Sequence, residues 1–384
     1  MDRFAGPLEA LWDLDRGKPL DRLTWDWWWW LIMLDPEKVP GGRQLMVLWS
    51  TKQTRNIDVN NTPWQGEGMP TRDDSGGVLS GMVASWWWDG QRMHEPIRLQ
   101  TCRMAVARPG DGIWPEETGG ALVPLLDDDL SMGLDGDQGR FWLNMVSRTS
   151  SGPNEFHVEM TPWNPAMSTL RSARNDYGRG MGYQIDRLHG SLAEASVDGD
   201  LMQGTGYFQR VKVQAPAVPW YWGMLHFSDG SYLDWFLPHA SLSMTSRSDR
   251  PWPLRHFGHI PLSQGGIWHD VGRGRTERFD RCQVILHPSS MTEGEEASYD
   301  SPLPRFEVRL MNGRTTIKLT AQARSRAHFR FDQPTRGGLV SHLTYNEYPL
   351  KVTNFLIRDE QGTRTLDEWD WIMGNGEHSW GLLH

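Results

Sequence analysis

Residues 24–35 read TWDWWWWLIMLD, a stretch with five tryptophans that continues into a short apolar run. Side chains alternate between the two faces of a β-strand, so a strand here carries Asp26 and Trp28 on one face and Trp27 and Trp29 on the other. Both faces are then aromatic. We expect one face to line a barrel and the other to pack against a second domain.

Tryptophan is abundant elsewhere in the chain as well, at residues 86–88 and in WYWGMLHFSDGSYLDWF at residues 220–236. The sequence holds 22 Trp against 12 Phe and 8 Tyr. An indole offers a wide apolar surface and one N–H donor, which suits the wall of a pocket for a bulky, mostly apolar ligand. The alternative interpretation is that tryptophan only fills wide barrel cores.

The pattern along the chain predicts an all-β protein. Gly (40) and Pro (24) interrupt the sequence at short intervals, and the runs between them alternate with a period of two. In MLHFSDGSYLDWF an Asp-Gly pair separates two such runs, which predicts a β-hairpin. Many antiparallel strands with short turns favour closed barrels, because closure removes exposed sheet edges.

Composition excludes several classes of protein. The net charge is −9 and the basic residues are scattered, so we expect no nucleic-acid partner. No apolar run is long enough for a membrane span, and the N-terminus lacks an export signal, so we expect a cytoplasmic protein. Two cysteines, Cys102 and Cys282, exclude a disulfide framework.

Several segments together resemble one family, the two-domain lipocalin-like superfamily that includes carotenoid 1,2-hydratase (hydroxyneurosporene synthase), AttH-type proteins and lipocalin-like Diels–Alderases. The segments are TWDWWWWLIMLD, HGSLAEASVDGDLMQGTGYFQRV, WYWGMLHFSDGSYLDWF, YDSPLPRFEVRL, LTYNEYPLKV and GNGEHSWG. The resemblance implies two calycin-like antiparallel β-barrels packed together, with an apolar pocket for polyenes or isoprenoids. The hydratases read G-x-G-Y-H-D-H where residues 204–210 read GTGYFQR. The acid and both histidines are replaced, which argues against hydratase chemistry from this strand.

We therefore expect three parts in the chain. Residues 1–20 form an N-terminal extension, residues 21–254 an N-terminal lipocalin-like barrel with long loops, and residues 255–384 a C-terminal lipocalin-like barrel.

An alkene can be protonated at neutral pH only by a carboxylic acid that burial or a neighbouring charge keeps neutral. The acids with aromatic or apolar neighbours are Asp26, Asp234 and Glu159. Tyr207 and His226 lie in the same Trp-rich segments and are candidates for proton relay, although a structural role is the alternative for each.

The ligand-binding candidates are the aromatic and amide or guanidinium side chains of these strands. They are Trp27, Trp28, Trp29, Trp87, Gln209, Arg210, Trp220, Trp222 and Trp235. Several indole rings could hold a folded polyene or stabilise a cation formed from it.

Two further groups of polar side chains are expected to have structural roles or surface positions. Glu347 and Glu377 match acidic positions of the family, and we expect them to bond arginines across the domain interface. The histidines of HFGHIPLSQGGIWHD, at residues 256–269, match no metal spacing, so we expect no metal and no cofactor.

The sequence thus predicts an enzyme acting on a hydrophobic isoprenoid or polyene substrate by cyclisation, cycloaddition or hydration-type chemistry. The alternative is a non-catalytic carrier of a lipid or pigment. A peripheral membrane contact for substrate delivery is left open, and so is the oligomeric state. A carbohydrate-binding module is less favoured, and it would require exposed rings at Trp30, Trp88 and Trp222.

Overall fold

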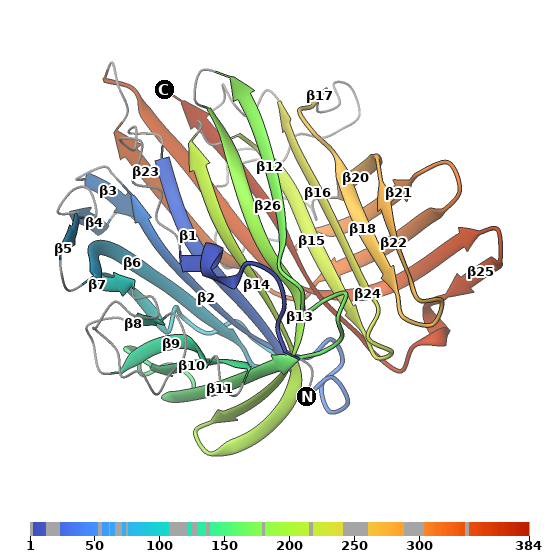
Figure 1. Cartoon of the computed structure of the whole chain (residues 1–384), viewed down its shortest axis with the longest axis horizontal. Coiled ribbons are helices and arrows are strands. Elements are labelled where there is room, and N and C mark those ends of the chain that lie inside the picture. Colours follow the sequence, from blue (N-terminus) through green and yellow to red (C-terminus); the bar gives the residue numbers. More distant parts are fainter. Residues whose placement is uncertain are drawn as a thin grey trace.

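The computed structural model describes residues 3–12, 24–52, 56–60, 62–65, 71–73, 76–106, 122–124, 129–135, 139–178, 181–214, 218–240, 260–287, 303–334 and 338–383. The described residues form two large sheets in which every pairing between named strands is antiparallel (Figure 1). One sheet curls into a half-barrel and the other into a nearly closed barrel. The predicted all-β fold of two packed barrels is confirmed.

The first sheet has the path β5-β6-β2-β1-β14-β13-β11-β10-β9-β8, with β7 paired to β6 and β12 to β13. Its strands are β1 (Thr24–Leu34), β2 (Arg43–Lys52), β5 (Thr71–Asp73), β6 (Gly76–Trp88), β7 (Arg98–Val106), β8 (Leu122–Pro124), β9 (Leu130–Asp135), β10 (Arg140–Val146), β11 (Glu155–Pro162), β12 (Arg171–Gly178), β13 (Met181–Val197) and β14 (Asp200–Gln214). The two sides of this sheet approach each other, because β7, which pairs with β6 near one end of the path, contacts β8 at the other end.

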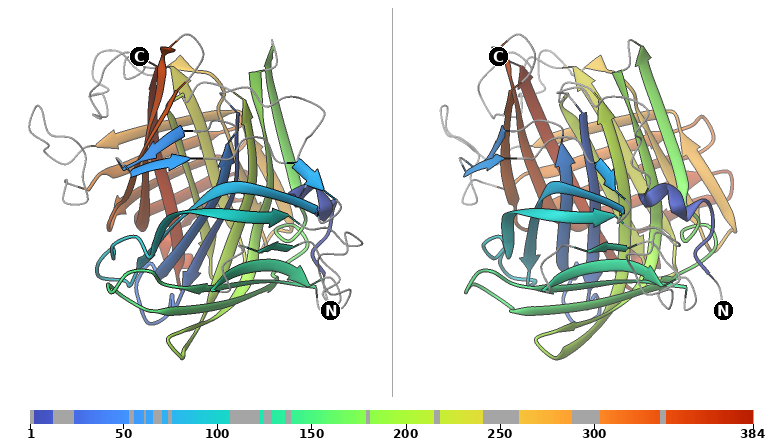
Figure 2. Two further views of the ribbon diagram at one scale, coloured as in Figure 1. Left: turned by 90° about the vertical axis from the view of Figure 1, so that its left-hand side faces the viewer. Right: turned by 60° about the vertical axis from the view of Figure 1, so that its left-hand side comes forward.

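The second sheet has the path β19-β18-β16-β15-β26-β24-β22-β21-β20, and β20 contacts β16. Its strands are β3 (Asn56–Val59), β4 (Thr62–Gln65), β15 (Trp220–Phe227), β16 (Tyr232–Ala240), β17 (Ile260–Pro261), β18 (Gly265–Asp270), β19 (Arg275–Phe279), β20 (Arg281–His287), β21 (Arg305–Met311), β22 (Thr316–Ala323), β23 (Ala327–Pro334), β24 (Val340–Asp359), β25 (Gly362–Thr365) and β26 (Ile372–Leu383). Figure 2 shows β3 and β4, early in the chain, beside the last strands of this sheet, where β3 pairs with β23.

Two short 3-10 helices, η1 (Leu8–Trp12) and η5 (Leu366–Glu368), complete the described elements. Residues from the predicted N-terminal extension contribute to the first barrel, since Phe4 and Leu11 are buried in its core. Among the residues that the structure describes, no helix has the length and apolar character needed to cross a membrane.

The hairpin predicted at residues 220–236 is confirmed as β15 and β16, and Gly230 adopts the positive φ (84°) of its turn. This hairpin belongs to the second sheet, because β15 pairs with β26 and β16 with β18. The chain therefore changes sheet between Gln214 and Trp220. The boundary predicted near residue 255 lies outside the described residues and stays a prediction about folding units.

Three apolar clusters follow from this arrangement. One fills the first barrel and contains Trp28, Trp30 and Trp87. A second fills the other barrel around Trp235 and Trp268. The third lies between the two sheets, and we call it the inter-sheet layer. Its buried apolar members are Trp29, Leu31, Met33, Met46, Leu48, Val59, Met82, Ala84, Trp86, Met167, Tyr207, Trp222, Met224, Tyr232, Ala327, Phe329, Phe331, Leu343, Tyr345 and Met373.

Candidate functional site

The inter-sheet layer brings together a row of side chains from each sheet. In the first sheet, Trp29 of β1 is the cross-strand partner of Gln209 of β14, which is in turn the partner of Arg187 of β13. Residues directly opposite one another on neighbouring strands share a face of the sheet. Trp29, Gln209 and Arg187 therefore form one row that faces the second sheet.

The facing row comes from four adjacent strands of the second sheet. Trp222 of β15 pairs with Phe236 of β16 on one side and with Glu377 of β26 on the other, and Glu377 pairs with Glu347 of β24. The ring centroids of Trp29 and Trp222 are 5.2 Å apart in an edge-to-face arrangement. The two rows are thus in direct contact.

Glu347 and Glu377 form a buried pair of carboxyl groups. Their residues are 0% and 4% exposed. The Tyr345 hydroxyl bonds to Oε1 of Glu377 at 2.7 Å and to Oε2 of Glu347, and the Trp220 indole N–H donates to Oε2 of Glu377 at 2.7 Å. A phenol has a single proton, so both Tyr345 bonds form together only when one of the two carboxyl groups is protonated and donates to the phenolic oxygen.

The pKa values of this pair are raised. Burial, followed by the facing charge of Glu377, raises the pKa of Glu347 well above its usual value. Burial also raises the pKa of Glu377, although the bonds from Trp220 and Tyr345 oppose the shift. Two carboxyl groups on directly paired residues in an apolar site repel each other when both are ionised, so ionisation of both is unfavourable. The pair therefore retains a proton where an exposed glutamate would have lost it, and it can act as a general acid.

Asp234 of β16 is a second buried acid of the layer. It accepts hydrogen bonds from the Tyr232 hydroxyl and from the backbone N–H of Ile267, both at 2.9 Å. Burial raises its pKa, against the opposing charge of Arg187. Asp234 thus faces the first sheet and not the interior of the second barrel.

Tyr207 packs against two of the tryptophans of the layer. Its ring lies 5.6 Å from that of Trp29 and 5.4 Å from that of Trp222, and its hydroxyl donates to Oε1 of Gln209 at 3.2 Å. Burial raises the pKa of Tyr207 well above its usual value. It is therefore a neutral hydrogen-bond donor at physiological pH.

The layer also contains polar atoms that have no partner within the described residues. There, the indole nitrogens of Trp29, Trp86 and Trp222 have no acceptor, and Oε1 of Glu347 has no hydrogen-bond partner. Leaving a buried donor unsatisfied costs about 1–3 kcal/mol, so such groups are rare in folded proteins. Trp49 and Trp235, in the two barrel cores, also lack acceptors. In the layer, the unpartnered indoles accompany a pair of buried acids that has no arginine or lysine within ion-pair distance among the described residues.

The structure divides the predicted site residues between several places. Those in the layer are Asp234, Tyr207, Trp27, Trp29, Gln209, Trp220 and Trp222, with Trp27 and Trp220 only partly buried. Others lie in the barrel interiors, Asp26, Trp28, Trp87 and Arg210 in the first and Trp235 in the second.

Asp26 and Arg210, predicted as a buried proton donor and a ligand contact, are paired with each other in the structure. Arg210 bonds to Asp26 at 3.2 Å, and its guanidinium lies 3.9 Å from the Trp28 ring centroid. The two charges thus satisfy each other inside the first barrel. Alternation along β1 and β14 explains this, because both residues share the barrel-facing side with Trp28.

Two other catalytic candidates lie apart from the acid pair. Glu159 is exposed and forms an ion pair with Arg140 at 2.7 Å, so it lacks the burial that a neutral acid requires. His226 is buried, and its ring nitrogens bond to Thr205 and to the carbonyl of His189, both at 2.7 Å. Burial lowers the pKa of His226 to about 3. The alternative structural role fits His226 better than proton relay.

The described contacts of Glu347 and Glu377 are not the predicted bonds to arginines. Their partners are Tyr345, Trp220 and each other, and neither carboxyl lies within ion-pair distance of an arginine in the described part of the chain. Arg187 was not predicted at all. The alternation of side chains along β13, β24 and β26 indicates which residues share a face with Arg187, Glu347 and Glu377. It does not indicate which strands pair with these three, because that depends on long-range register.

No group of three metal-binding side chains occurs among the described residues. Of the histidine-rich segment, His256 and His259 lie outside those residues. His269 bonds to Thr276, and Asp270 contacts Arg364. The rings of Trp30, Trp88 and Trp222 are each 2% exposed, which does not fit the exposed platform of a carbohydrate-binding module.

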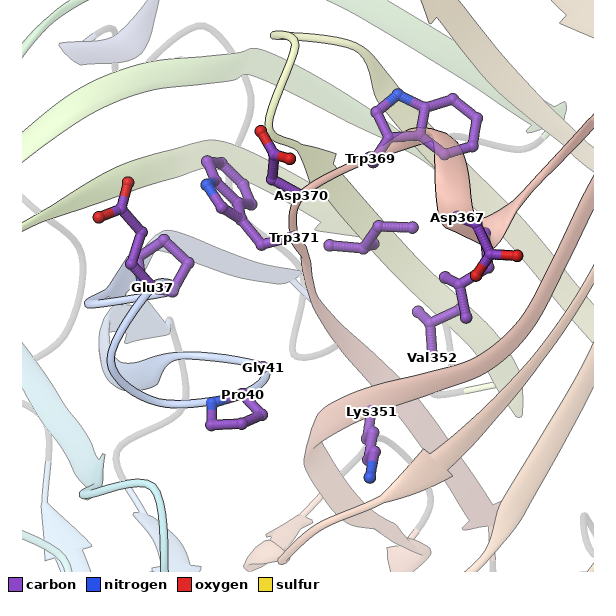
Figure 3. A pocket seen from close by; sticks show the side chains of 12 residues that line it. Glu37, Pro40, Gly41, Lys351, Val352, Asp367, Trp369, Asp370 and Trp371 are labelled. Carbon is purple, nitrogen blue, oxygen red and sulfur yellow. The ribbon is translucent and has the colours of Figure 1, made fainter.

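A separate cleft of about 660 Å³ opens between the 35–42 loop of the first sheet and the η5 region of the second (Figure 3). The cleft is lined by Pro36, Glu37, Pro40, Gly41, Lys351, Val352, Leu366, Asp367, Trp369, Asp370, Trp371 and Ile372. Its acids Glu37, Asp367 and Asp370 are exposed. It contains none of the buried acids of the layer, so we do not assign the chemistry to it.

Comparison with known proteins gives matches at the level of solved structures. No protein-family description matches the chain, and no curated protein matches it. A protein assigned as AttH from Nitrosomonas europaea is 15% identical, with a TM-score of 0.48, and the match covers 94% of this chain and 97% of that one. CghA is 10% identical, with a TM-score of 0.43, and 98% and 96% are covered. AttH-type proteins are among the group that the sequence resembles. At these TM-scores the similarities carry no argument about residues or chemistry.

Proposed function

We propose that this protein is an enzyme that binds a largely apolar small molecule between its two sheets and catalyses a proton-transfer reaction on it. The observation that carries the proposal is the cross-strand pair of Glu347 and Glu377, buried without an arginine or lysine counter-ion among the described residues. A general acid must hold its proton at the working pH. Burial raises the pKa of both glutamates, and the facing charge of Glu377 raises that of Glu347 further.

The reaction class follows from what surrounds the acid. The protonated carboxyl group delivers its proton to an alkene carbon or to a substrate oxygen, which leaves a cation on the substrate. The rings of Trp29, Trp222 and Tyr207 stabilise such a cation by about 0.5–2 kcal/mol each. The partner carboxylate then takes a proton from a neighbouring carbon, which gives isomerisation or cyclisation with unchanged mass. Capture of the cation by water followed by loss of a proton gives a hydrated product.

The rim of the layer supports a route for the substrate. Trp27, Tyr183, Trp220 and Phe236 are half-buried, unlike the fully buried aromatics deeper in the layer. At the other end, the Gln44 amide donates to the carbonyl of Gly374 at 2.8 Å and closes the layer. We place the opening at the half-buried end.

The alternative function is a non-catalytic carrier of a lipid or pigment. The unpartnered indoles of Trp29, Trp86 and Trp222 favour binding of an oxygen-bearing ligand without requiring turnover. A cytoplasmic location, a peripheral membrane contact and the absence of a cofactor remain predictions from the sequence.

The test is a screen of polyenes and linear isoprenoids for quenching of tryptophan fluorescence, followed by mass analysis of each mixture after incubation. Glu347→Gln and Glu377→Gln keep the volume and remove the acid, and we expect each to lower turnover by about 10²–10⁴-fold. Glu159→Gln, on the exposed face of β11, is the matched control and is expected to leave turnover unchanged. Saturable binding with every ligand recovered unchanged identifies a carrier instead.

A further inference from the structure

Arg187 of β13 is a charged side chain of the layer that has almost no partner. Its side chain is 12% exposed, and its only ion pair within the described residues joins Nη1 to Oδ2 of Asp234 at 3.9 Å. That separation is beyond hydrogen-bonding distance. The Nε–H of Arg187 is buried and has no acceptor among the described residues. A guanidinium with five donors is therefore held in a largely buried place without a hydrogen bond to any part of the chain that the structure describes.

Asp234 does not account for the position of Arg187. The two oxygens of Asp234 already accept hydrogen bonds from Tyr232 and Ile267. A buried cation is costly unless it is paired, and the planar guanidinium fork matches a carboxylate in a bidentate arrangement.

The neighbours of Arg187 define where the rest of a ligand lies. Gln209 is beside it on β14 and Trp29 is beside Gln209 on β1, so an aromatic wall begins next to the guanidinium. Across the layer, β26 is two strands from β16 in the second sheet. At a strand spacing of about 4.8 Å, Glu377 is roughly 10 Å from Asp234. A molecule of moderate length therefore reaches from Arg187 to the carboxyl pair.

We infer that the substrate is an apolar carboxylic acid whose carboxylate is bound by Arg187, while its hydrocarbon part lies along Trp29 and Trp222 toward Glu377. The inference rests on the proposed function and names its substrate class. Arg187 is a specificity-determining residue in this arrangement. The proton is delivered at the opposite end of the same molecule, by the carboxyl pair.

The probes that test this are cis-parinaric acid, a fluorescent polyene acid, and its methyl ester, which differ only in the head group. We expect the wild-type protein to bind the acid at least tenfold more tightly than the ester at pH 7. Arg187→Met should remove that preference by weakening the acid about tenfold or more, with ester affinity unchanged. Arg187→Lys retains the charge and should keep part of the preference. Arg140→Met, at the exposed pair with Glu159, is the matched control.

Equal affinity of the wild-type protein for acid and ester overturns the inference without reference to any variant. Equal weakening of both probes by Arg187→Met also overturns it, because the arginine would then act through packing. The two proposals fail separately. If the wild-type protein shows no preference for the acid but turnover still depends on Glu377, the proposed proton donor is supported and the carboxylate site at Arg187 is not. If the protein prefers the acid but converts no ligand, the carboxylate site is supported and the proposed reaction is not.

Discussion

The two faces of β1 carry the same residue type in different environments. Trp28 faces the first barrel, where its indole N–H donates to the carbonyl of Leu11 at 2.7 Å and its ring packs on Arg210. Trp29 faces the inter-sheet layer, and its indole N–H has no acceptor among the described residues. Both side chains are almost completely buried. Trp28 and Trp29 therefore differ not in burial but in whether the indole N–H has a hydrogen-bond partner.

The charged groups follow the same division. In the first barrel, Asp26 and Arg210 form an ion pair, so each charge is compensated. In the layer, Glu347 faces Glu377 and no counter-ion completes the pair within the described chain. The first arrangement serves stability. The second is costly to the folded protein, which is what a site kept for a ligand and a proton would require.

The largest expected effect comes from opening the compensated pair. Arg210→Met leaves Asp26 buried and uncompensated, and we expect it to lower the free energy of unfolding by about 3–5 kcal/mol. Chemical denaturation measures this. The double variant Asp26→Asn, Arg210→Met should recover most of the loss, and Arg140→Met at the exposed pair should cost less than about 1 kcal/mol. A small effect of Arg210→Met would mean that the first barrel tolerates a buried carboxylate without a counter-ion, as the inter-sheet layer does.

For the pair of Glu347 and Glu377, we expect removal of one acid to stabilise the protein as the pH rises. Because the pKa of Glu347 in the folded protein is raised well above the ordinary value of 4.5, the folded protein binds more protons than the unfolded chain at pH values above about 4.5. The wild-type protein should therefore lose stability relative to Glu347→Gln, by up to about 1.4 kcal/mol per pH unit. Denaturation at pH 5, 6, 7 and 8 measures the difference, with Glu159→Gln as the control. Parallel curves for wild type and Glu347→Gln would contradict the raised pKa.

The smallest effect separates the two tryptophans. Trp28→Phe and Trp29→Phe remove similar volumes, but only the first breaks a hydrogen bond and leaves the Leu11 carbonyl without its donor. We expect Trp28→Phe to be about 1 kcal/mol more destabilising than Trp29→Phe. Trp29→Phe should instead weaken ligand binding in the fluorescence titration. If the two variants cost the same, the indole of Trp29 has a partner in solution that its surroundings in the protein do not provide.

Much of the fold could be predicted from local pattern. Alternation in TWDWWWWLIMLD predicted a strand with two aromatic faces, and the Asp-Gly pair predicted the β15–β16 hairpin, because both signals act over a few residues. The pairing of Asp26 with Arg210 could not be predicted in this way. The two residues are 184 positions apart, so neither has its partner among its neighbours in sequence.

The sequence by itself determined the strands, their two-sided character and the aromatic richness of the chain, since these depend on the side chains within one strand. Only the tertiary structure decided that Glu347 and Glu377 oppose each other, that Arg187 shares a row with Trp29, and that both rows face one layer. The physical reason is register. A strand fixes which residues share a face, but pairing over long distances and the packing of two sheets fix which faces meet.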